Sequence, residues 1–394
     1  MNSNIKKLGV ADIFRAHGEA YRQCRFVSTE QQKVMNHIRA CRTAELGGHV
    51  EQCDACDFER ISYNSCRDRH CPLCQTMVKE QWLNDRKAEL LPCGYFHLVF
   101  TLPHGLNPII LRNRAATLRI LFAAVNETLQ AFAGDKAWRL NGRLGFIAVL
   151  HTWSQTLMDH FHLHCLIPAG ALSADNTRWI AARKSFLFRV KSLAKEFRKR
   201  YLGKINQLFQ KNKLVFPGDA AALAEPPNFA KLLHSLAKTA WITYAKRPFD
   251  GPEQVLEYLG RYTHRIAISN NRILDITDDN KVRFSYRDRA ANNEVKTLTI
   301  STDEFIRRFL LHVLPHGFVK IRYFGFLANK VKRNAIPLLR VLMNPKAKVP
   351  EKRIETAMEI MLRLTGIDLT CCPVCKKGKM VVVQKLVPGI PNTS

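Results

Sequence analysis

The distribution of hydrophobic and polar positions divides the middle of the chain into short strands and amphipathic helices. A helix is indicated after Asn107-Pro108, where proline suits the first turn, by apolar residues at helical spacing: Leu118, Leu121, Phe122, Val125, Leu129 and Phe132. A second helix is indicated in the same way by Phe186, Val190, Leu193, Phe197 and Tyr201. Further helices are expected at residues 231–245 and 252–264, and strands at residues 95–102, 145–151, 161–167, 272–276, 281–286 and 295–300.

The charge balance is more informative about function than the apolar content is. Of 394 residues, 46% are hydrophobic, which is ordinary for a globular protein, but the formal net charge is +28. The basic residues are spread along the chain, and an excess of this size favours a polyanionic partner through phosphate neutralisation. The alternative is a soluble basic protein without such a partner. The sequence shows no apolar run of membrane-spanning length and no N-terminal signal core, so a cytoplasmic protein is expected.

Cysteines are concentrated near the N-terminus, where seven of the 12 precede residue 93. Disulfides are rare in the cytosol, so this clustering favours metal binding. Two C-x-x-C pairs, Cys53 with Cys56 and Cys71 with Cys74, are separated by fourteen residues, a spacing that suits a tetrahedral Zn²⁺ site. The candidate ligands, enough for two ions, are Cys41, His49, Cys53, Cys56, Cys66, His70, Cys71 and Cys74. The alternative is a set of buried free cysteines.

Three histidines share one face of a predicted strand. Side chains alternate along a strand, so His160, His162 and His164 point to one side while the apolar residues between them point to the other. Imidazoles two residues apart can converge on one ion, which makes this face a candidate metal site. The alternatives are histidines packed in the core, or a zinc hydrolase, since those enzymes use related His-x-His pairs.

Two tyrosines follow on the helix expected at residues 252–264. Tyr258 and Tyr262 are four residues apart, so they lie on one helix face and can point at one site. Tyrosine can be a covalent nucleophile towards phosphorus, because a phenoxide is stable enough to leave again when strands are rejoined. Such a pair taken alone is usually a packing contact. Together with a histidine strand in a basic protein, it indicates cleavage and rejoining of nucleic acid.

These motifs together resemble the HUH-type, two-tyrosine rolling-circle transposases of bacterial insertion sequences. The resembling segments are the zinc-binding domain (41–75), the first strand motif (97–108), the histidine motif (151–172) and the tyrosine region (244–273). The resemblance implies an α+β fold whose HUH-nuclease core has a central antiparallel sheet with flanking helices. The implied domains are a zinc-binding, DNA-recognition module (1–92), the nuclease core (93–300) and a small basic helical region with a C-x-x-C pair (301–394).

The resemblance also implies roles for the candidate residues. His162 and His164 would bind a catalytic Mg²⁺ or Mn²⁺ ion. Gln155 is the first choice for a third ligand, and its rivals are His151, His160 and His264. Tyr258 and Tyr262 would be the nucleophiles, Tyr258 acting first, and would leave a 5′-phosphotyrosine link and a free 3′-OH. The partner would be DNA, single-stranded at the element ends, and the bacterial protein would associate with the nucleoid when bound to it.

Near the C-terminus, Cys372 and Cys375 form another C-x-x-C pair with only Cys371 close by. This pair is either half of a second zinc site that is completed elsewhere in the chain, or an idle remnant. Other functions compete with a transposase: a plasmid-type replication initiator or relaxase with the same chemistry, a non-catalytic zinc-dependent DNA-binding protein, and a zinc hydrolase. The N-terminal zinc module favours the transposase over the initiator and the relaxase.

Overall fold

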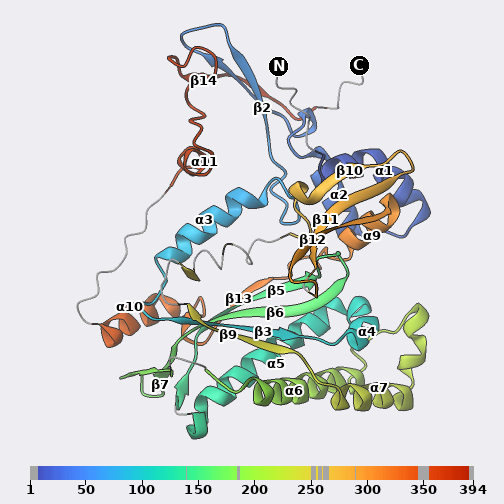
Figure 1. The fold of residues 1–394 in the computed structure, drawn as a ribbon, viewed down its shortest axis with the longest axis vertical. Helices are drawn as coiled ribbons and strands as arrows, with labels where there is room; N and C mark the ends of the chain where they lie inside the picture. The colour runs from blue at the N-terminus through green and yellow to red at the C-terminus, as the bar shows by residue number, and fades with distance from the viewer. Residues whose placement is uncertain are drawn as a thin grey trace.

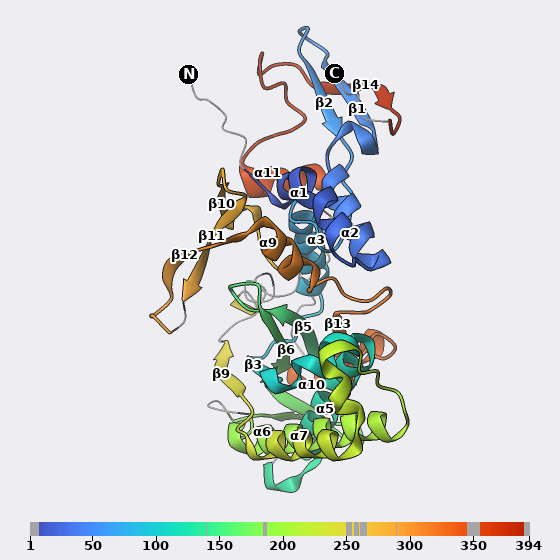
Figure 2. The same ribbon diagram turned by 90° about the vertical axis from the view of Figure 1, so that its right-hand side faces the viewer.

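The computed structural model arranges the chain in three regions along its longest axis (Figures 1 and 2). At one end lies a five-stranded sheet with helices beneath it. In the middle are the N-terminal helices and a three-stranded sheet, and at the other end is a narrow sheet that projects away from the rest. The structure describes residues 8–138, 140–183, 187–249, 254–255, 260, 266–288, 290–344 and 355–389.

The central sheet has the strand order β13-β5-β6-β3-β9, and all neighbouring strands in it are antiparallel. Its strands are β3 (Tyr95–Thr101), β5 (Phe146–Trp153), β6 (Asp159–Pro168), β9 (Thr243–Phe249) and β13 (Ile321–Phe324). The predicted strands at 95–102, 145–151 and 161–167 are thus confirmed, with ends that shift slightly. The histidine strand β6 is the middle strand of the sheet.

The edge strand β9 differs from the prediction of a helix over residues 231–245. Helix α7 (Pro226–Lys238) begins and ends earlier, and the chain re-enters the sheet at Thr243. The turn is fixed by Trp241, which is buried in the core and donates a hydrogen bond from Nε1 to the Leu236 carbonyl (3.1 Å). A threonine and an aromatic residue, Thr243 and Tyr244, then suit a strand that pairs with β3.

Helices cover one face of the central sheet, as Figure 1 shows below the strands. They are α4 (Asn107–Arg112), α5 (Arg114–Gly134), α6 (Val190–Gln210) and α7. The apolar residues of β6, such as Leu163 and Cys165, point into this core and meet Leu121 of α5 and Phe197 of α6. Leu121 and Phe197 are among the helix positions that the periodicity predicted to be buried. Phe186, another such position, lies outside the described residues. The histidines of β6 therefore point to the opposite face.

The N-terminal helices share a second core with a distant part of the sequence. Helices α1 (Val10–Cys24) and α2 (Thr29–Ala40) pack against β10 (Ile273–Ile276), β11 (Lys281–Asp288), β12 (Glu294–Ser301) and α9 (Thr302–Leu310). The Ser28 hydroxyl caps α2 by accepting the Gln31 N–H, and the Gln31 side chain accepts the Ser28 N–H. The Phe14 and Phe309 rings meet edge to face, 5.3 Å between centroids. The three strands predicted between residues 272 and 300 are confirmed.

A third sheet combines strands from opposite ends of the chain. Its order is β14-β1-β2, with β1 (Gly48–Cys53), β2 (Glu59–Tyr63) and β14 (Met380–Leu386). Helix α3 (Gln75–Lys87) leads from this region towards the central sheet, and α10 (Lys332–Met343) and α11 (Ala357–Thr365) belong to the returning tail. Arg363 of α11 pairs with Glu80 of α3 (3.2 Å). The domain boundaries at 92 and 300 stay predictions, but part of the tail lies beside the N-terminal cysteines.

The described residues confirm a mixed α+β protein with antiparallel sheets. A small separate sheet is formed by β4 (Gly142–Arg143), β7 (Gly170–Ser173) and β8 (Trp179–Ala181). The helix predicted at 252–264 falls largely outside the described residues, among which Gln254, Val255 and Gly260 are helical. None of the helices in the described part of the chain combines the length and the apolar character needed to cross a membrane.

Candidate active site and metal centres

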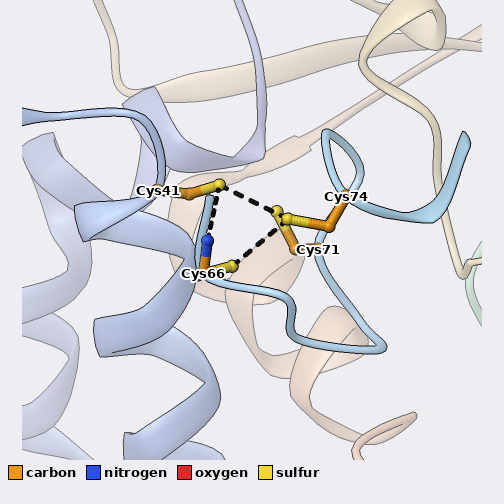
Figure 3. A group of neighbouring side chains, drawn as sticks. All are labelled: Cys41, Cys66, Cys71 and Cys74. Atoms are coloured by element: carbon orange, nitrogen blue, oxygen red, sulfur yellow. Dashed lines mark hydrogen bonds between the residues drawn. The ribbon is translucent and has the colours of Figure 1, made fainter. Parts of the chain in front are cut away.

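Four cysteine sulfurs converge where α2 ends and α3 begins (Figure 3). Cys41 directly follows α2 and Cys74 directly precedes α3, while Cys66 and Cys71 come from the segment between these helices. The ligand atoms all lie within 4.8 Å of one another, and the Cys74 sulfur is 3.6 Å from those of Cys41 and Cys66. A zinc tetrahedron with Zn–S bonds of about 2.3 Å has sulfurs about 3.8 Å apart, so the group has the dimensions of a zinc site.

Hydrogen bonds within this group favour the thiolate form of Cys41 and Cys74, and they raise the pKa of Cys66 and Cys71. Side-chain hydrogen bonds from Cys66 and Cys71 lower the pKa of Cys41 to about 7. Those from Cys41, Cys66 and Cys71 also lower the pKa of Cys74, which lies at the N-terminus of α3, where the helix dipole favours negative charge. The Cys66 N–H additionally donates to the Cys41 sulfur (3.5 Å). Thiolates are the form that binds zinc, so Cys41 and Cys74 are disposed to bind the ion, and binding by Cys66 and Cys71 would release their protons.

The other N-terminal cysteines join the tail, which differs from the pairing that the C-x-x-C spacing suggested. The sulfurs of Cys53 and Cys56 lie within 4.8 Å of those of Cys372 and Cys375, and apart from the pair Cys71 and Cys74. The reason is the β1–β2 hairpin, because a six-residue strand such as β1 spans about 20 Å and carries Cys53 to the far tip. The tail pair thereby meets two further cysteines.

His49 and His70, expected among the zinc ligands, lie outside both four-cysteine groups. The Leu314 N–H donates to His70 Nε2 (3.4 Å), so Nδ1 carries the proton and donates to an Asp68 carboxylate oxygen (3.0 Å). Both ring nitrogens of His70 therefore have protein partners, and Nε2 joins the zinc region to residue 314. His49 lies on β1, where its Nε2 is 3.9 Å from a Glu51 carboxylate oxygen.

A third group of candidate metal ligands lies on the central sheet. His162 and His164 of β6 share a sheet face with His151 of β5, which is directly paired with His162. The ligand atoms of these three histidines lie within 4.8 Å of one another. All three side chains are buried, between 3% and 8% exposed. The structure thus adds His151, one of the rivals for the third ligand, to the expected pair.

The other rivals are placed differently. Gln155 lines the same pocket as the three histidines, and its backbone carbonyl accepts a hydrogen bond from Arg272. The His160 ring is 4.7 Å from that of His162 between centroids, but His160 is not a member of the three-histidine group. His264 lies outside the described residues.

Two contacts orient the rings of His162 and His164. His162 Nδ1 donates to the carbonyl of His160 (2.8 Å), and His164 Nδ1 is 2.9 Å from Nε2 of His97 on β3. Metal-binding histidines usually use the second ring nitrogen for such a partner, which fixes the tautomer. A metal ion would accordingly be bound through Nε2 of both residues. His97, only 4% exposed, was missed by the sequence reasoning, where it appeared only as the first residue of a strand motif.

The three histidines open into a pocket of about 270 Å³. Its other wall is the end of β11, where Tyr286, Arg287 and Asp288 line the cavity. Arg287 is exposed, and Asp288 is engaged by Lys296 (2.8 Å), so this carboxylate has a cation of its own. Sequence reasoning missed this wall because it lies more than a hundred residues from the histidine strand and carries no motif.

Tyr258 and Tyr262 lie outside the described residues, but their neighbour Val255 does not. Val255 is fully buried and belongs to the same cluster of buried side chains as Val149 and Leu166. Val149 lies two residues before His151 on β5, and Leu166 lies two residues after His164 on β6. Because side chains alternate along a strand, Val255 packs on the sheet face that carries the histidines.

Gly260, which lies between the two tyrosines in the sequence, is next to α3. A Cβ atom built at this position would be 2.9 Å from Cδ1 of Leu83. The described part of the tyrosine segment therefore contacts both the histidine face of the central sheet and the helix that begins at the first cysteine group.

Comparison with known proteins gives matches over most of the chain. Residues 13–102 match the family described as "Transposase zinc-binding domain", and residues 145–335 match the family described as "Putative transposase". The chain is 26% identical over 363 residues to "Transposase for insertion sequence element IS801" from Pseudomonas savastanoi pv. phaseolicola, covering 91% of this chain and 84% of that one. It is 49% identical over 379 residues to "Putative transposase y4qJ" from Sinorhizobium fredii (strain NBRC 101917 / NGR234), covering 95% and 94%. The chain belongs to this family of insertion-sequence transposases.

The two matched ranges of this transposase contain different groups of candidate metal ligands. The zinc-binding domain contains the whole first cysteine group and also Cys53 and Cys56, whereas Cys372 and Cys375 lie beyond both matches. The range 145–335 contains the three-histidine group and the tyrosine segment. No solved structure matches the chain.

Proposed function

We propose that this transposase cleaves and rejoins single-stranded DNA at the ends of its element, in rolling-circle-like transposition. A tyrosine, Tyr258 or Tyr262, would attack a phosphate held at the three-histidine group. The net charge of +28 supports a DNA partner, because binding of basic side chains to phosphates releases counterions. The family supports the transposase over a plasmid initiator or relaxase with the same chemistry.

The observation that carries this proposal is the packing of Val255 on the histidine face of the sheet. Consecutive Cα atoms are 3.8 Å apart, so the Cα atom of Tyr258 is within about 11 Å of that of Val255. By the same rule, the Cα atom of Tyr262 is within about 8 Å of that of Gly260. This short covalent connection supports a role for the two tyrosines at the histidine face, although they are nearly a hundred residues from the histidines in sequence.

The donor set fits a divalent transition metal held by His151, His162 and His164, with Gln155 as a further candidate ligand. Mg²⁺ prefers oxygen ligands and keeps its waters, whereas transition metals accept imidazole nitrogen, so we expect Mn²⁺ to serve better than Mg²⁺. When bound, such an ion polarises the scissile phosphate and stabilises the departing 3′ oxygen. The His160 carbonyl and His97 would hold the rings of His162 and His164 in the orientation that this binding needs.

The tyrosine step exchanges one phosphoester bond for another. Attack by the phenolic oxygen on phosphorus forms the tyrosine–phosphate bond and breaks the bond to the 3′ oxygen, and the phenol loses its proton while the 3′ oxygen gains one. Attack by a 3′-OH on the phosphotyrosine then reverses the step and rejoins a strand. The bond energy is conserved, so no nucleotide cofactor is required. Arg287, exposed at the opposite wall of the pocket, is suited to contact a phosphate of the bound strand.

The test is a covalent adduct assay with labelled single-stranded DNA from the element ends and Mn²⁺. Wild-type protein should form a DNA adduct that survives denaturing electrophoresis. The adduct should disappear in the double variant Tyr258→Phe/Tyr262→Phe and in His162→Ala. Tyr63→Phe, in the narrow sheet on strand β2, is the matched tyrosine control and should retain it. An adduct that persists in both site variants would refute the assignment, and wild-type binding without any adduct would favour a non-catalytic DNA-binding protein.

A further inference from the structure

The second cysteine group joins two segments that are more than 300 residues apart in sequence. Cys53 and Cys56 come from the tip of the β1–β2 hairpin, and Cys372 and Cys375 come from the loop that precedes β14. The Cys53 sulfur is 3.7 Å from that of Cys375, and the Cys56 sulfur is 3.7 Å from that of Cys372. These four thiols form a group distinct from the one at the start of α3.

The separations fit a metal ion and not a disulfide. Sulfurs at the corners of a zinc tetrahedron are about 3.8 Å apart, whereas sulfurs joined in a disulfide are about 2.05 Å apart. Backbone N–H groups also point at two of the sulfurs, Ala55 N–H at Cys53 (3.4 Å) and Gly378 N–H at Cys375 (3.3 Å). Such donors stabilise the negative charge of thiolate ligands, so the chemistry of the group suits Zn²⁺ as well as its size does.

The two loops are shaped to meet each other around the sulfurs. Asp54 N–H donates to the Lys379 carbonyl (3.0 Å), and Lys379 N–H donates back to the Asp54 side chain (2.7 Å). Gly378 allows this approach, because a Cβ atom at that position would be 2.4 Å from the Cys53 sulfur. The loop of the tail therefore has glycine where the opposing cysteine comes closest.

The narrow sheet has little apolar burial with which to hold the tail. The residues of β14 are all exposed or half-buried, and Val381, Val382 and Val383 are each at least 50% exposed. The residues of β2 are also exposed or half-buried along the whole strand. A small region without an apolar core typically obtains its folding free energy from a structural metal. The cysteine group lies where that contribution is needed, at the tip of the hairpin beside β14.

We propose that Cys53, Cys56, Cys372 and Cys375 bind a second structural Zn²⁺ ion, which fastens the C-terminal segment to the N-terminal zinc-binding domain. Two of its ligands lie outside the matched zinc-binding range, so the site makes the tail from about residue 369 a structural part of that domain. Arg60, whose guanidinium donates to the Leu369 carbonyl (3.1 Å), adds a contact between the same segments. This inference does not depend on the tyrosine chemistry, because it concerns only the thiol group and the strands beside it.

Cysteine footprinting on the unaltered, zinc-loaded protein tests the site under reducing conditions. Iodoacetamide should modify Cys372 and Cys375 slowly, and removal of the metal with a chelator should make both react much faster. The exposed Cys24, far from this group in the sequence, is the internal control whose rate should be independent of the chelator. Rates at Cys372 and Cys375 that do not change on chelation would overturn the proposal.

Zinc content measured by plasma mass spectrometry gives the second test. The double variant Cys372→Ser/Cys375→Ser should contain one Zn²⁺ ion fewer per chain than wild type, whereas Cys371→Ser should retain the wild-type content. Hydrogen exchange in the same samples should become faster for the peptide at 380–386 and stay unchanged for the peptide at 161–167, which reports the central sheet. Equal zinc in wild type and the double variant, with the central sheet intact, would refute the site.

Discussion

The imidazoles of His97 and His164 share a hydrogen bond of 2.9 Å across the neighbouring strands β3 and β6. The rings are nearly parallel, with an interplanar angle of 8° and centroids 5.2 Å apart. For His164 to bind a metal through Nε2, its proton must lie on Nδ1, and His97 Nε2 must accept it. The contact thus selects the tautomer of one candidate ligand by means of a residue that need not touch the ion.

Replacement of His97 should weaken metal binding without removing a ligand. We expect His97→Phe, which keeps a ring but loses the acceptor, to lower Mn²⁺ affinity by about 10- to 100-fold. His97→Gln retains an acceptor and should recover part of the loss. The measurement is calorimetric Mn²⁺ titration, with Tyr244→Phe, on the adjacent strand β9, as the control. Equal affinity in wild type and His97→Phe would show that the contact does not orient a ligand.

The identity of the third ligand can be decided by paired substitutions. His151→Ala should reduce Mn²⁺ affinity as strongly as His162→Ala. The reason is that a ligand nitrogen of His151 lies within 4.8 Å of the ligand nitrogens of His162 and His164. Gln155→Ala should have a smaller effect, since the turn at Gln155 is held through its backbone carbonyl by Arg272. Calorimetric titration of the three variants ranks them. A larger loss of Mn²⁺ affinity in Gln155→Ala than in His151→Ala would identify Gln155 as the third ligand.

Arg287 should contribute to DNA affinity through a phosphate contact. Arg287→Gln is expected to weaken binding of single-stranded DNA about equally for different sequences, and to reduce the slope of log affinity against log salt by about one. Fluorescence anisotropy over a series of salt concentrations measures both quantities. Lys281→Gln, at the other end of β11, removes the same charge away from the pocket and serves as the control. An unchanged salt slope in Arg287→Gln would contradict the contact.

His312 should make the stability of the protein depend on pH. Burial, reinforced by the nearby cations Arg114 and Arg307, lowers its pKa from 6.5 to about 3 in the folded state. Its Nε2–H donates to the Leu157 carbonyl (3.0 Å), a contact that opposes the shift, but burial has the larger effect and favours the neutral ring in the folded protein. Below pH 6.5 the unfolded chain binds a proton that the folded chain does not, so stability should fall by about 1.4 kcal/mol per pH unit as pH decreases towards 3.

Denaturant unfolding of wild type and His312→Gln between pH 7 and pH 5 isolates this contribution. Thiolates and other groups titrate in both proteins, so the difference between the two pH slopes belongs to position 312. Wild type should lose stability more steeply than the variant as the pH decreases. Parallel slopes would mean that His312 is protonated as easily in the folded protein as in the unfolded one.

Local patterns predicted the parts of this molecule that depend on local physics. The alternation along β6 correctly separated Leu163 and Cys165 from His162 and His164, because a strand has only two faces. Helical spacing located the buried side of α5 and α6 for the same kind of reason. The predicted end of the helix at residue 245 was wrong, because burial of Trp241 is a tertiary effect that overrides helical periodicity.

Contacts between distant segments could not be predicted in the same way. The C-x-x-C spacing gave two cysteine pairs in the N-terminal segment, but only the fold shows that the hairpin separates Cys53 from Cys71 and brings it to Cys375. The position of Arg287 opposite the histidines depends on how β11 docks against the central sheet, and no sequence motif encodes that docking. The contact of His97 with His164 depends on strand pairing between β3 and β6.

Identification of the DNA-linked residue by peptide mass spectrometry decides whether a tyrosine of the segment after Val255 is the nucleophile. The purified adduct is digested with protease and nuclease, and the peptide that carries the residual nucleotide is sequenced. We expect a phosphotyrosine at Tyr258 or Tyr262, on the peptide that follows Val255. Modification of Tyr286, the described tyrosine that lines the histidine pocket, or of any residue outside 258–262 would contradict it.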